Sequence, residues 1–252
     1  MLVIGIDAAS HNIIEPNHDS LPNISSIIRE GRYMRIGLNE PPLSAPLWCS
    51  MFSGKTPDEH RHTNFVIRGE VQKRSNIEVE FIWDVLHKHG LDVRVLQVPF
   101  VYPPYNFRCE FSPIKNGLST ELADMERDMK RITEKSLDVL SQKPDLFIVV
   151  YNMLDKLSHF HWGEPLILDW YKKIDNIIGR LVEHDEKIII VSDHGFCSWD
   201  ESKTHTLPRK NAHGREIKGD HSNTSIAILR GFEYDIRRPQ DIFFAIKKGF
   251  ER

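Results

Sequence analysis

Uncharged aliphatic runs separated by amphipathic stretches dominate the chain, and the runs predict buried strands. The most continuous runs lie at 3–6, 146–150 and 188–191, and an acidic residue follows each of them. Unbroken apolar runs of this length are typical of parallel strands that are covered on both faces. Strands are predicted at 3–6, 33–38, 93–98, 146–151, 187–191 and 225–229.

Amphipathic periodicity between these runs predicts helices. Apolar residues recur at helical spacing, and glycines such as Gly31 and Gly90 follow two of the periodic stretches as stop signals. Helices are predicted at 21–28, 46–54, 78–89, 120–140, 166–183 and 239–250. The proline-rich stretch 41–46 must be extended or turning, which places Ser44 at or just before a helix N-terminus.

Alternation of strands and helices indicates an α/β fold with a mainly parallel central sheet and helices on both faces. Residues 1–252 are expected to form a single domain, because folds of this class commonly reach this size undivided. Two stretches, 99–117 and 196–220, have no clear period and are expected to be loops or small caps near the site.

Composition excludes several classes of function. The formal net charge is -3, with 40% hydrophobic and 27% charged residues, so nothing indicates nucleic acid or an acidic membrane as the main partner. No stretch approaches the length of a membrane-spanning helix, and the N-terminus lacks the features of a signal peptide. The three cysteines are widely spaced, which is typical of reduced thiols. We therefore expect a cytoplasmic protein of unknown oligomeric state.

Carboxylates and imidazoles follow the predicted strands and indicate a metal centre. Asp155 and His159 are four residues apart, so a helix would present both on one face. Asp193 and His194 directly follow a strand, and the bend at Gly195 allows both side chains to face one cavity. Asp155 and His159 are also consistent with unrelated polar residues on a solvated face. Asp193 and His194 are also consistent with a structural His-Asp pair. Since all four lie at one predicted sheet edge, convergence favours the metal.

Three more residues are expected at the same edge of the sheet. Asp7 follows the first strand, where it is also consistent with a helix cap or turn, and His221 precedes the last strand. Ser44 supplies a hydroxyl at a helix N-terminus, where an anion and an incoming phosphate are favoured. Serine is a weak nucleophile unless its alkoxide is stabilised, and a divalent cation does this. Without the metal ligands, Ser44 would be an ordinary turn serine.

In combination and in order, these motifs resemble the type I phosphodiesterase/nucleotide pyrophosphatase family of the alkaline phosphatase superfamily. The resemblance covers nearly the whole chain and rests on the aspartate after the first strand and four blocks, Pro42–His60, Asp155–His159, Ser192–Phe196 and Gly219–His221. It implies an alkaline-phosphatase-like fold with a minimal cap. It also implies a hydrolase that cleaves phosphodiester or pyrophosphate bonds of nucleotide-like substrates through a covalent phosphoserine-type intermediate.

The resemblance also implies a role for each residue of the blocks. Ser44 is the implied nucleophile. The implied ligands are Asp7, Ser44, Asp193 and His194 for one metal, and Asp155, His159 and His221 for a second. The two divalent ions are implied to be zinc, although ligands without thiolate also accept manganese or iron. Such pairs clamp the attacking and leaving oxygens of an in-line displacement.

One departure concerns phosphate binding. Members of the family often have asparagine where this chain has Leu47, so the main-chain N–H of Ala45 or the side chain of Asn64 would have to hold the phosphate oxygen. Two alternatives to the diesterase therefore stay open. The first is a phosphomonoesterase or phosphomutase with the same two-metal site. The second is a non-catalytic module that binds metal or nucleotide.

Overall fold

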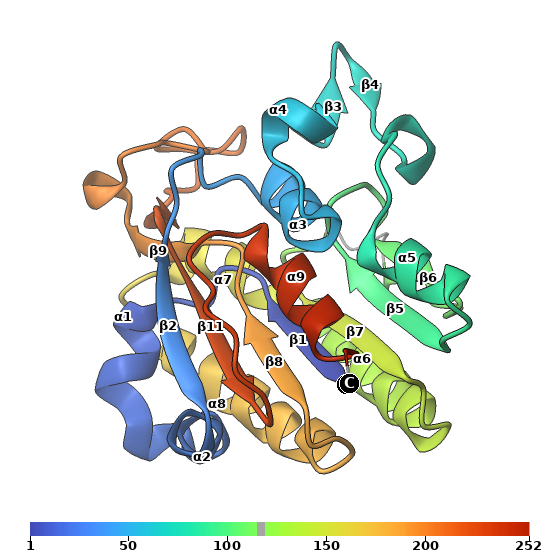
Figure 1. The fold of residues 1–252 in the computed structure, drawn as a ribbon. Coiled ribbons are helices and arrows are strands. Elements are labelled where there is room, and N and C mark those ends of the chain that lie inside the picture. The colour runs from blue at the N-terminus through green and yellow to red at the C-terminus, as the bar shows by residue number, and fades with distance from the viewer. Residues whose placement is uncertain (115–118, 252) are drawn as a thin grey trace.

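A seven-stranded mixed sheet forms the centre of the molecule (Figure 1). The computed structural model describes residues 1–114 and 119–251. The strands of the sheet are β1 (Leu2–Ile6), β2 (Arg32–Gly37), β5 (Val93–Val98), β6 (Tyr105–Phe107), β7 (Leu146–Tyr151), β8 (Ile188–Val191) and β11 (Thr224–Arg230). Their order is β2-β11-β8-β1-β7-β5-β6. The four central strands β8, β1, β7 and β5 are parallel, whereas β11 pairs antiparallel with β8 and β2, and β6 with β5.

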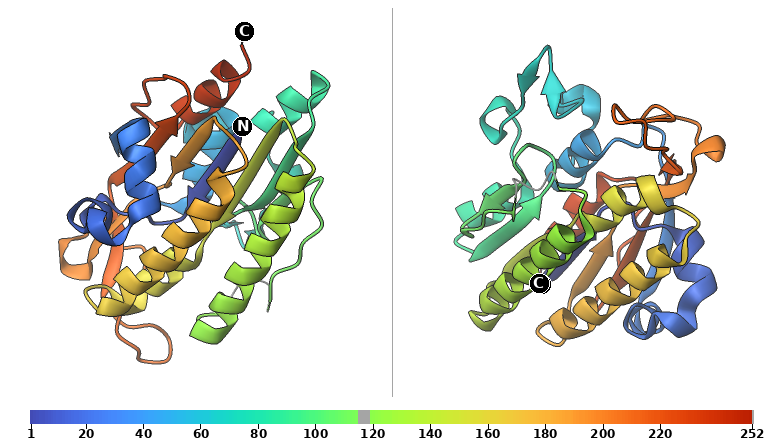
Figure 2. Two further views of the ribbon diagram at one scale, coloured as in Figure 1. Left: turned by 90° about the horizontal axis from the view of Figure 1, so that it is seen from below. Right: turned by 180° about the vertical axis from the view of Figure 1, so that it is seen from behind.

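Helices cover both faces of this sheet, which confirms the predicted α/β class. The α-helices are α1 (His11–Ile14), α2 (Pro22–Glu30), α3 (Ser44–Ser53), α4 (Pro57–His60), α5 (Ile82–Lys88), α6 (Leu122–Ser141), α7 (Met153–His161), α8 (Pro165–Val182) and α9 (Asp241–Lys248). Short 3-10 helices are η1 (Glu15–Ser20), η2 (Arg74–Asn76) and η4 (Trp199–Glu201). Helices α2, α6 and α8 pack on one face, as Figure 2 shows for α6 and α8, and α3, α5 and α9 pack on the other.

Strand β1 shows why the aliphatic runs have no polar alternation. Leu2 and Ile4 belong to the hydrophobic core on the side of α8, whereas Val3 belongs to the core on the side of α3. Both faces of the strand are buried, so both sets of positions must be apolar. Gly5 has a separate reason, because a Cβ there would lie 2.7 Å from the Trp48 ring. Helix α3 therefore packs closely on β1, and this contact places the start of α3 above the end of β1.

The first residues of the predicted helices shift in the structure, and two of these shifts have a clear local cause. The helix predicted at 46–54 begins at Ser44, since Leu43 is extended and Pro46 fits the first turn, where its missing N–H costs no hydrogen bond. The helix predicted at 78–89 begins only at Ile82. There the Asp84 carboxylate accepts the N–H of Phe81 and caps the N-terminus, with Phe81 itself in an extended conformation.

The two stretches predicted to be loops contain strands, so that part of the prediction was wrong. Strand β6 lies within 99–117, of which residues 115–117 fall outside the described residues. In the second stretch, β9 (Gly195–Ser198) pairs antiparallel with β10 (Gly219–Ser222). Strands of three or four residues carry too little periodicity to be recognised, and here they form by pairing with segments distant in sequence.

A hairpin that the sequence analysis missed stands beyond the sheet, at the top of Figure 1. It consists of β3 (Val66–Ile67) and β4 (Glu70–Val71), which pair antiparallel. Gly69 occupies its turn with a φ of 81°, a conformation that glycine adopts without strain. Across residues 1–114 and 119–251, none of the helices has the length and hydrophobicity that crossing a bilayer requires.

Candidate active site

The predicted ligands follow neighbouring strands and meet at one edge of the sheet. Asp7 directly follows β1, and Asp193 and His194 follow β8, its neighbour on one side. Asp155 and His159 lie on α7, directly after β7, the neighbour of β1 on the other side. This is the carboxyl edge, where open α/β sheets place their ligands. Strand β10 brings in His221, and α3 begins at Ser44.

Ser44 lies in one group of potential ligands. Its Oγ is 3.2 Å from His194 Nε2. The same nitrogen is 3.2 Å from Asp193 Oδ2 and 3.7 Å from Asp7 Oδ1. Potential ligand atoms of the two aspartates and the histidine all lie within 4.8 Å of one another, close enough to bind one cation. The structure thus brings together the four residues expected to share the first metal.

A second group lies against the first. Asp155 Oδ1 is 3.0 Å from His221 Nε2 and 3.6 Å from His159 Nε2, and the two imidazole nitrogens are 3.3 Å apart. The rings of His194 and His221 stack with centroids 3.7 Å apart and connect the two groups. All the side chains expected to bind the second metal are therefore together.

Each of the three histidines has its Nδ1 beside a backbone carbonyl. His159 contacts the carbonyl of Gly219 at 3.2 Å, His194 that of Gly195 at 3.1 Å, and His221 that of Pro42 at 2.5 Å. A carbonyl accepts only from a protonated Nδ1, which leaves the Nε2 lone pair free to bind a cation. The backbone carbonyls therefore favour the tautomer in which the Nε2 atom of each ring can accept, and all three Nε2 atoms face the two ligand groups.

Burial makes the carboxylates of the first group costly to ionise. Desolvation raises the pKa of Asp7 well above its usual range, and the charges of Asp193 and Asp155 raise it further. Burial also raises the pKa of Asp193 to about 7 and lowers that of His194. Burial acts in the same direction on Asp155, but the imidazoles of His159 and His221 outweigh it and hold the pKa of this carboxyl well below its usual range.

Unpartnered oxygens show that the site fits a cation. Asp7 Oδ1 and Asp193 Oδ2 are buried among the described residues without a hydrogen-bond partner. A buried carboxylate oxygen without a partner is strongly unfavourable unless a cation compensates it. Both oxygens belong to the group around Ser44, and the nearby donors are oxygen and nitrogen without thiolate, a set that zinc, manganese and iron accept.

Loop contacts hold the aspartates in place. The N–H of Ala8 donates to Asp193 Oδ1 at 3.2 Å, which ties the end of β1 to the end of β8. Ser192 Oγ donates to the carbonyls of Ala9 and His194 at 2.9 and 2.8 Å and fixes the turn after β8. A Cβ on Gly195 would lie 2.5 Å from the Thr224 carbonyl oxygen, so the turn requires glycine.

Asp220 is a site residue that the sequence analysis did not select. It is buried on β10, and its carboxylate lies within 4.8 Å of the ring nitrogens of His159 and His221. The N–H groups of Thr206 and His221 donate to it at 2.9 and 2.8 Å. Its position next to His221 in the sequence was the available signal. Asp220 is thus bonded to the backbone of His221, and its carboxylate is a further potential ligand beside the second group.

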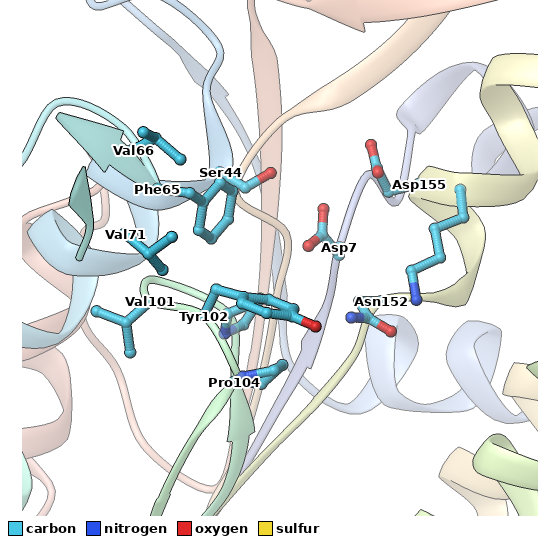
Figure 3. Close-up of a pocket in the computed structure, with 12 residues that line it drawn as sticks. Asp7, Ser44, Phe65, Val66, Val71, Val101, Tyr102, Pro104, Asn152 and Asp155 are labelled. Carbon is cyan, nitrogen blue, oxygen red and sulfur yellow. The ribbon is translucent and has the colours of Figure 1, made fainter. Parts of the chain in front are cut away.

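A pocket of about 380 Å³ opens beside the reactive groups (Figure 3). Its polar side contains Ser44, Asp7 and Asp155. The other lining residues are Phe65, Val66 and Val71 in and next to the hairpin, Pro99, Val101, Tyr102 and Pro104 after β5, Asn152 just before α7 and Lys156 on α7. Figure 3 shows the Tyr102 hydroxyl pointing toward Asn152, on the side of the pocket away from the hairpin. The stretch after β5 and the hairpin therefore both contribute side chains to the wall of the pocket.

The two predicted phosphate-binding groups occupy different surroundings. Ala45 is buried on the first turn of α3, next to Ser44. Asn64 is exposed and is not among the pocket-lining residues, and its Oδ1 accepts the N–H of Phe65. The structure therefore leaves the Asn64 side chain outside the pocket lining, with its amide oxygen bonded to the neighbouring backbone. Leu47 is buried one turn after Ser44.

Comparison with known proteins agrees with this geometry. The model of the family described as type I phosphodiesterase / nucleotide pyrophosphatase matches residues 1–231. No curated protein sequence matches the chain significantly.

Solved structures share the fold at low sequence identity. Murine ectonucleotide pyrophosphatase / phosphodiesterase 5, as an inactive variant in complex with AMP, has a TM-score of 0.68 at 12% identity, covering 98% of this chain and 94% of that one. The human protein has a TM-score of 0.66 at 14% identity, with the same coverage. Phosphonoacetate hydrolase from Sinorhizobium meliloti 1021, in complex with phosphonoformate, has a TM-score of 0.62 at 15% identity. The match covers 85% of this chain but spans only 58% of the hydrolase.

The family match extends from β1 to the end of β11 and so includes every residue of the two ligand groups. The chain belongs to the type I phosphodiesterase / nucleotide pyrophosphatase family, a family of phosphohydrolases, as its motifs predicted.

Proposed function

We propose that this protein is a metal-dependent hydrolase that cleaves phosphodiester or pyrophosphate bonds with Ser44 as the nucleophile. The observation that carries the proposal is the position of the Ser44 hydroxyl. It lies 3.2 Å from His194 Nε2, beside unpartnered carboxylate oxygens, and it also lines a pocket large enough for an organic phosphate. The proposed nucleophile thus lies next to both the proposed cation site and the cavity that would hold the substrate.

The residues that would hold the metals are those of the two groups. Asp7, Ser44, Asp193 and His194 would hold one ion, and Asp155, His159 and His221 the other. When bound, divalent ions stabilise a serine alkoxide and neutralise charge on the phosphoryl oxygens. Zinc suits these ligands best, and manganese or iron remain compatible.

The protein's own groups would carry out a two-step displacement. Ser44 Oγ forms a bond to phosphorus while the bond between phosphorus and the leaving oxygen breaks, which leaves the remaining phosphoryl group on Ser44. Water then attacks the same phosphorus and releases the serine oxygen. Because Ser44 and Ala45 lie in the first turn of α3, the N–H of Ala45 and the helix dipole would stabilise a phosphoryl oxygen in place of the asparagine that Leu47 replaces.

The pocket favours a diester over a monoester. Most of its lining residues are apolar and lie beside the nucleophile, so a substrate with an organic group on phosphorus would bury that group there. The murine structural relative binds AMP and the phosphonoacetate hydrolase binds phosphonoformate, and we propose a small-molecule phosphate ester or nucleotide as the substrate here too. We also propose that the chain acts as a single catalytic domain.

Three substrates assayed in parallel test this function. Purified protein loaded with zinc, manganese or iron is given bis-p-nitrophenyl phosphate, p-nitrophenyl phosphate and a nucleoside triphosphate. We expect turnover of the diester or the triphosphate, and loss of that turnover with a chelator. Faster turnover of the monoester would support the phosphomonoesterase or phosphomutase instead. Binding without turnover of any substrate would support the non-catalytic module.

A further inference from the structure

The pocket beside Ser44 has two sides that differ in chemistry. Its ionisable side chains and the amide of Asn152 lie toward β1 and α7, and Figure 3 shows the Tyr102 hydroxyl pointing the same way. The opposite side, here called the apolar wall, comes from the hairpin and from the segment after β5, and its members are Phe65, Val66, Val71, Val101 and Pro104. None of these side chains carries a hydrogen-bond donor or acceptor. A ligand group on this side therefore meets side chains that offer it no hydrogen bond.

Val66 and Val71 are the members of the apolar wall with the most free surface. Each is 49% exposed, more than any other large hydrophobic side chain that the structure describes. They are register partners of the antiparallel strands β3 and β4, so both project from one face of the hairpin. The next pair, Ile67 and Glu70, projects from the other face and is not among the described lining residues. Apolar surface that stays exposed beside a pocket is typical of a face that a ligand covers.

A ligand with many polar groups fits the apolar wall poorly. The hydroxyl groups of a sugar or the polar edge of a nucleobase would leave water there without gaining a partner, which is unfavourable. A hydrocarbon group would instead cover the exposed surface of Val66 and Val71, and burial of apolar surface favours binding. The pocket volume of about 380 Å³ is at the small end for ligand pockets and suits a single ring or a short chain next to the phosphate.

The ester group that stays on phosphorus is the one that can reach the apolar wall. Paired cations in such sites stabilise the attacking oxygen on one side and the leaving oxygen on the other. Ser44 belongs to the first ligand group, so the leaving oxygen would face the second group, which includes Asp155. Figure 3 shows Asp155 on the side of the pocket opposite to Val66 and Val71. The leaving group and the apolar wall would therefore lie on different sides of the phosphate.

We propose that the apolar wall selects the ester group that stays on phosphorus, so that the preferred substrate is a phosphodiester in which this group is an alkyl or aryl hydrocarbon and not a nucleoside or a sugar. This inference rests on the proposed function, since it narrows the substrate class of the same site. Val66 and Val71 are specificity-determining residues, and they recognise the ligand by its apolar surface.

A matched set of diesters tests the inference. Each has p-nitrophenol as the leaving group, and the second ester group is methyl, cyclohexyl, tetrahydropyran-4-yl or 5′-thymidyl. The cyclohexyl ester should have a kcat/KM at least about tenfold above that of the methyl ester, because it buries more apolar carbons. The tetrahydropyranyl ester has the same shape with a ring oxygen, and its kcat/KM should be at least about threefold below that of the cyclohexyl ester. Equal kcat/KM values for methyl and cyclohexyl, or a higher value for thymidyl than for cyclohexyl, would overturn the inference.

Variants of the hairpin connect the preference to Val66 and Val71. The double variant with Val66→Thr and Val71→Thr keeps the branched Cβ that suits a strand but places hydroxyl groups on the apolar wall. It should lower the cyclohexyl-to-methyl ratio of kcat/KM at least about threefold. Ile67→Thr adds the same hydroxyl on the other face of the hairpin, and as the matched control it should keep the full ratio. A full ratio in the double variant would contradict the assignment.

A binding experiment separates this inference from the proposed function. Metal-loaded Ser44→Ala protein is titrated calorimetrically with methyl phosphate and with cyclohexyl phosphate. At least about tenfold tighter binding of cyclohexyl phosphate, with a more negative heat-capacity change, supports the inference. Equal affinities overturn it, whether or not the wild-type protein turns over any diester. Tighter binding of cyclohexyl phosphate without turnover of any of the diesters would count against the proposed hydrolase alone.

Discussion

The hydroxyl oxygen of Ser44 lies 3.2 Å from Nε2 of His194, although 150 residues separate them in the chain. Helix α3 carries the serine, and the turn after β8 carries the histidine. The close packing of Trp48 on Gly5 fixes α3 against the sheet, and Ser192 fixes the turn. The geometry of the site therefore depends on the position of the N-terminus of α3 relative to the carboxyl edge of the sheet.

The first prediction concerns the nucleophile. Ser44→Ala should lower kcat for a diester by about a thousandfold or more, because no other group replaces the attacking oxygen. Ser53→Ala, at the other end of α3, is the matched control and should retain turnover within a fewfold. Steady-state kinetics of metal-loaded protein measures both. Comparable activity in Ser44→Ala and wild type would remove Ser44 from the mechanism.

Asp193→Asn should have opposite effects on metal binding and on stability. The variant should lose one equivalent of metal and nearly all turnover, measured by elemental analysis and kinetics. In metal-free protein above pH 7, however, it should raise the free energy of unfolding by about 1–3 kcal/mol, because a buried carboxylate with a pKa of about 7 no longer has to ionise. Two metals in the variant, or a metal-free variant less stable than wild type, would disprove this assignment.

The raised pKa of Asp193 also gives metal-free protein a particular pH dependence. The folded carboxyl has a pKa of about 7, above its value in the unfolded chain, so the folded state binds the extra proton between about pH 4 and 7. This contribution to stability is complete at low pH and disappears as the pH rises through 7. Metal affinity should increase over the same rise, since the ion competes with that proton. Denaturation and metal titration from pH 5 to 8 measure both trends, and metal affinity that is flat across this range would contradict them.

Gly5 should be far less tolerant of substitution than Gly37. An alanine Cβ at Gly5 would lie 2.7 Å from both the Trp48 ring and the Val150 side chain, whereas nothing lies within 4 Å of the corresponding position at Gly37. Gly5→Ala should therefore cost about 1–3 kcal/mol and lower turnover by displacing α3. Gly37→Ala should be close to neutral in both. Equal denaturation midpoints for the two variants would show that α3 does not depend on this contact.

Most of the sheet and the positions of the candidate ligands could be predicted from the sequence because both depend on local patterns. The run 188–191 is buried on both faces, and Asp193 follows it in the chain. The same short segment therefore predicts both the strand and the candidate ligand at its end. The helical placement of Asp155 and His159 likewise follows from their spacing and is confirmed by α7.

The pocket could not be predicted in the same way. Its outer wall comes from Phe65, Val66 and Val71, on a hairpin with strands of two residues each, which carries no readable period. Asn152 and Lys156 are ordinary polar residues in the sequence, and they line a pocket because the fold brings the hairpin and the chain after β5 to the same edge of the sheet. The prediction for Asn64 depends on its side-chain chemistry alone, and the structure leaves this residue exposed and outside the pocket lining.

The most direct test of the account is to trap the covalent intermediate. Metal-loaded protein is mixed with bis-p-nitrophenyl phosphate, quenched in acid during the first turnover and digested, and the peptides are analysed by mass spectrometry. We expect a p-nitrophenyl phosphoryl group on Ser44, with one p-nitrophenol released per modified serine. The same modification on a different side chain, with Ser44 unmodified, would contradict it.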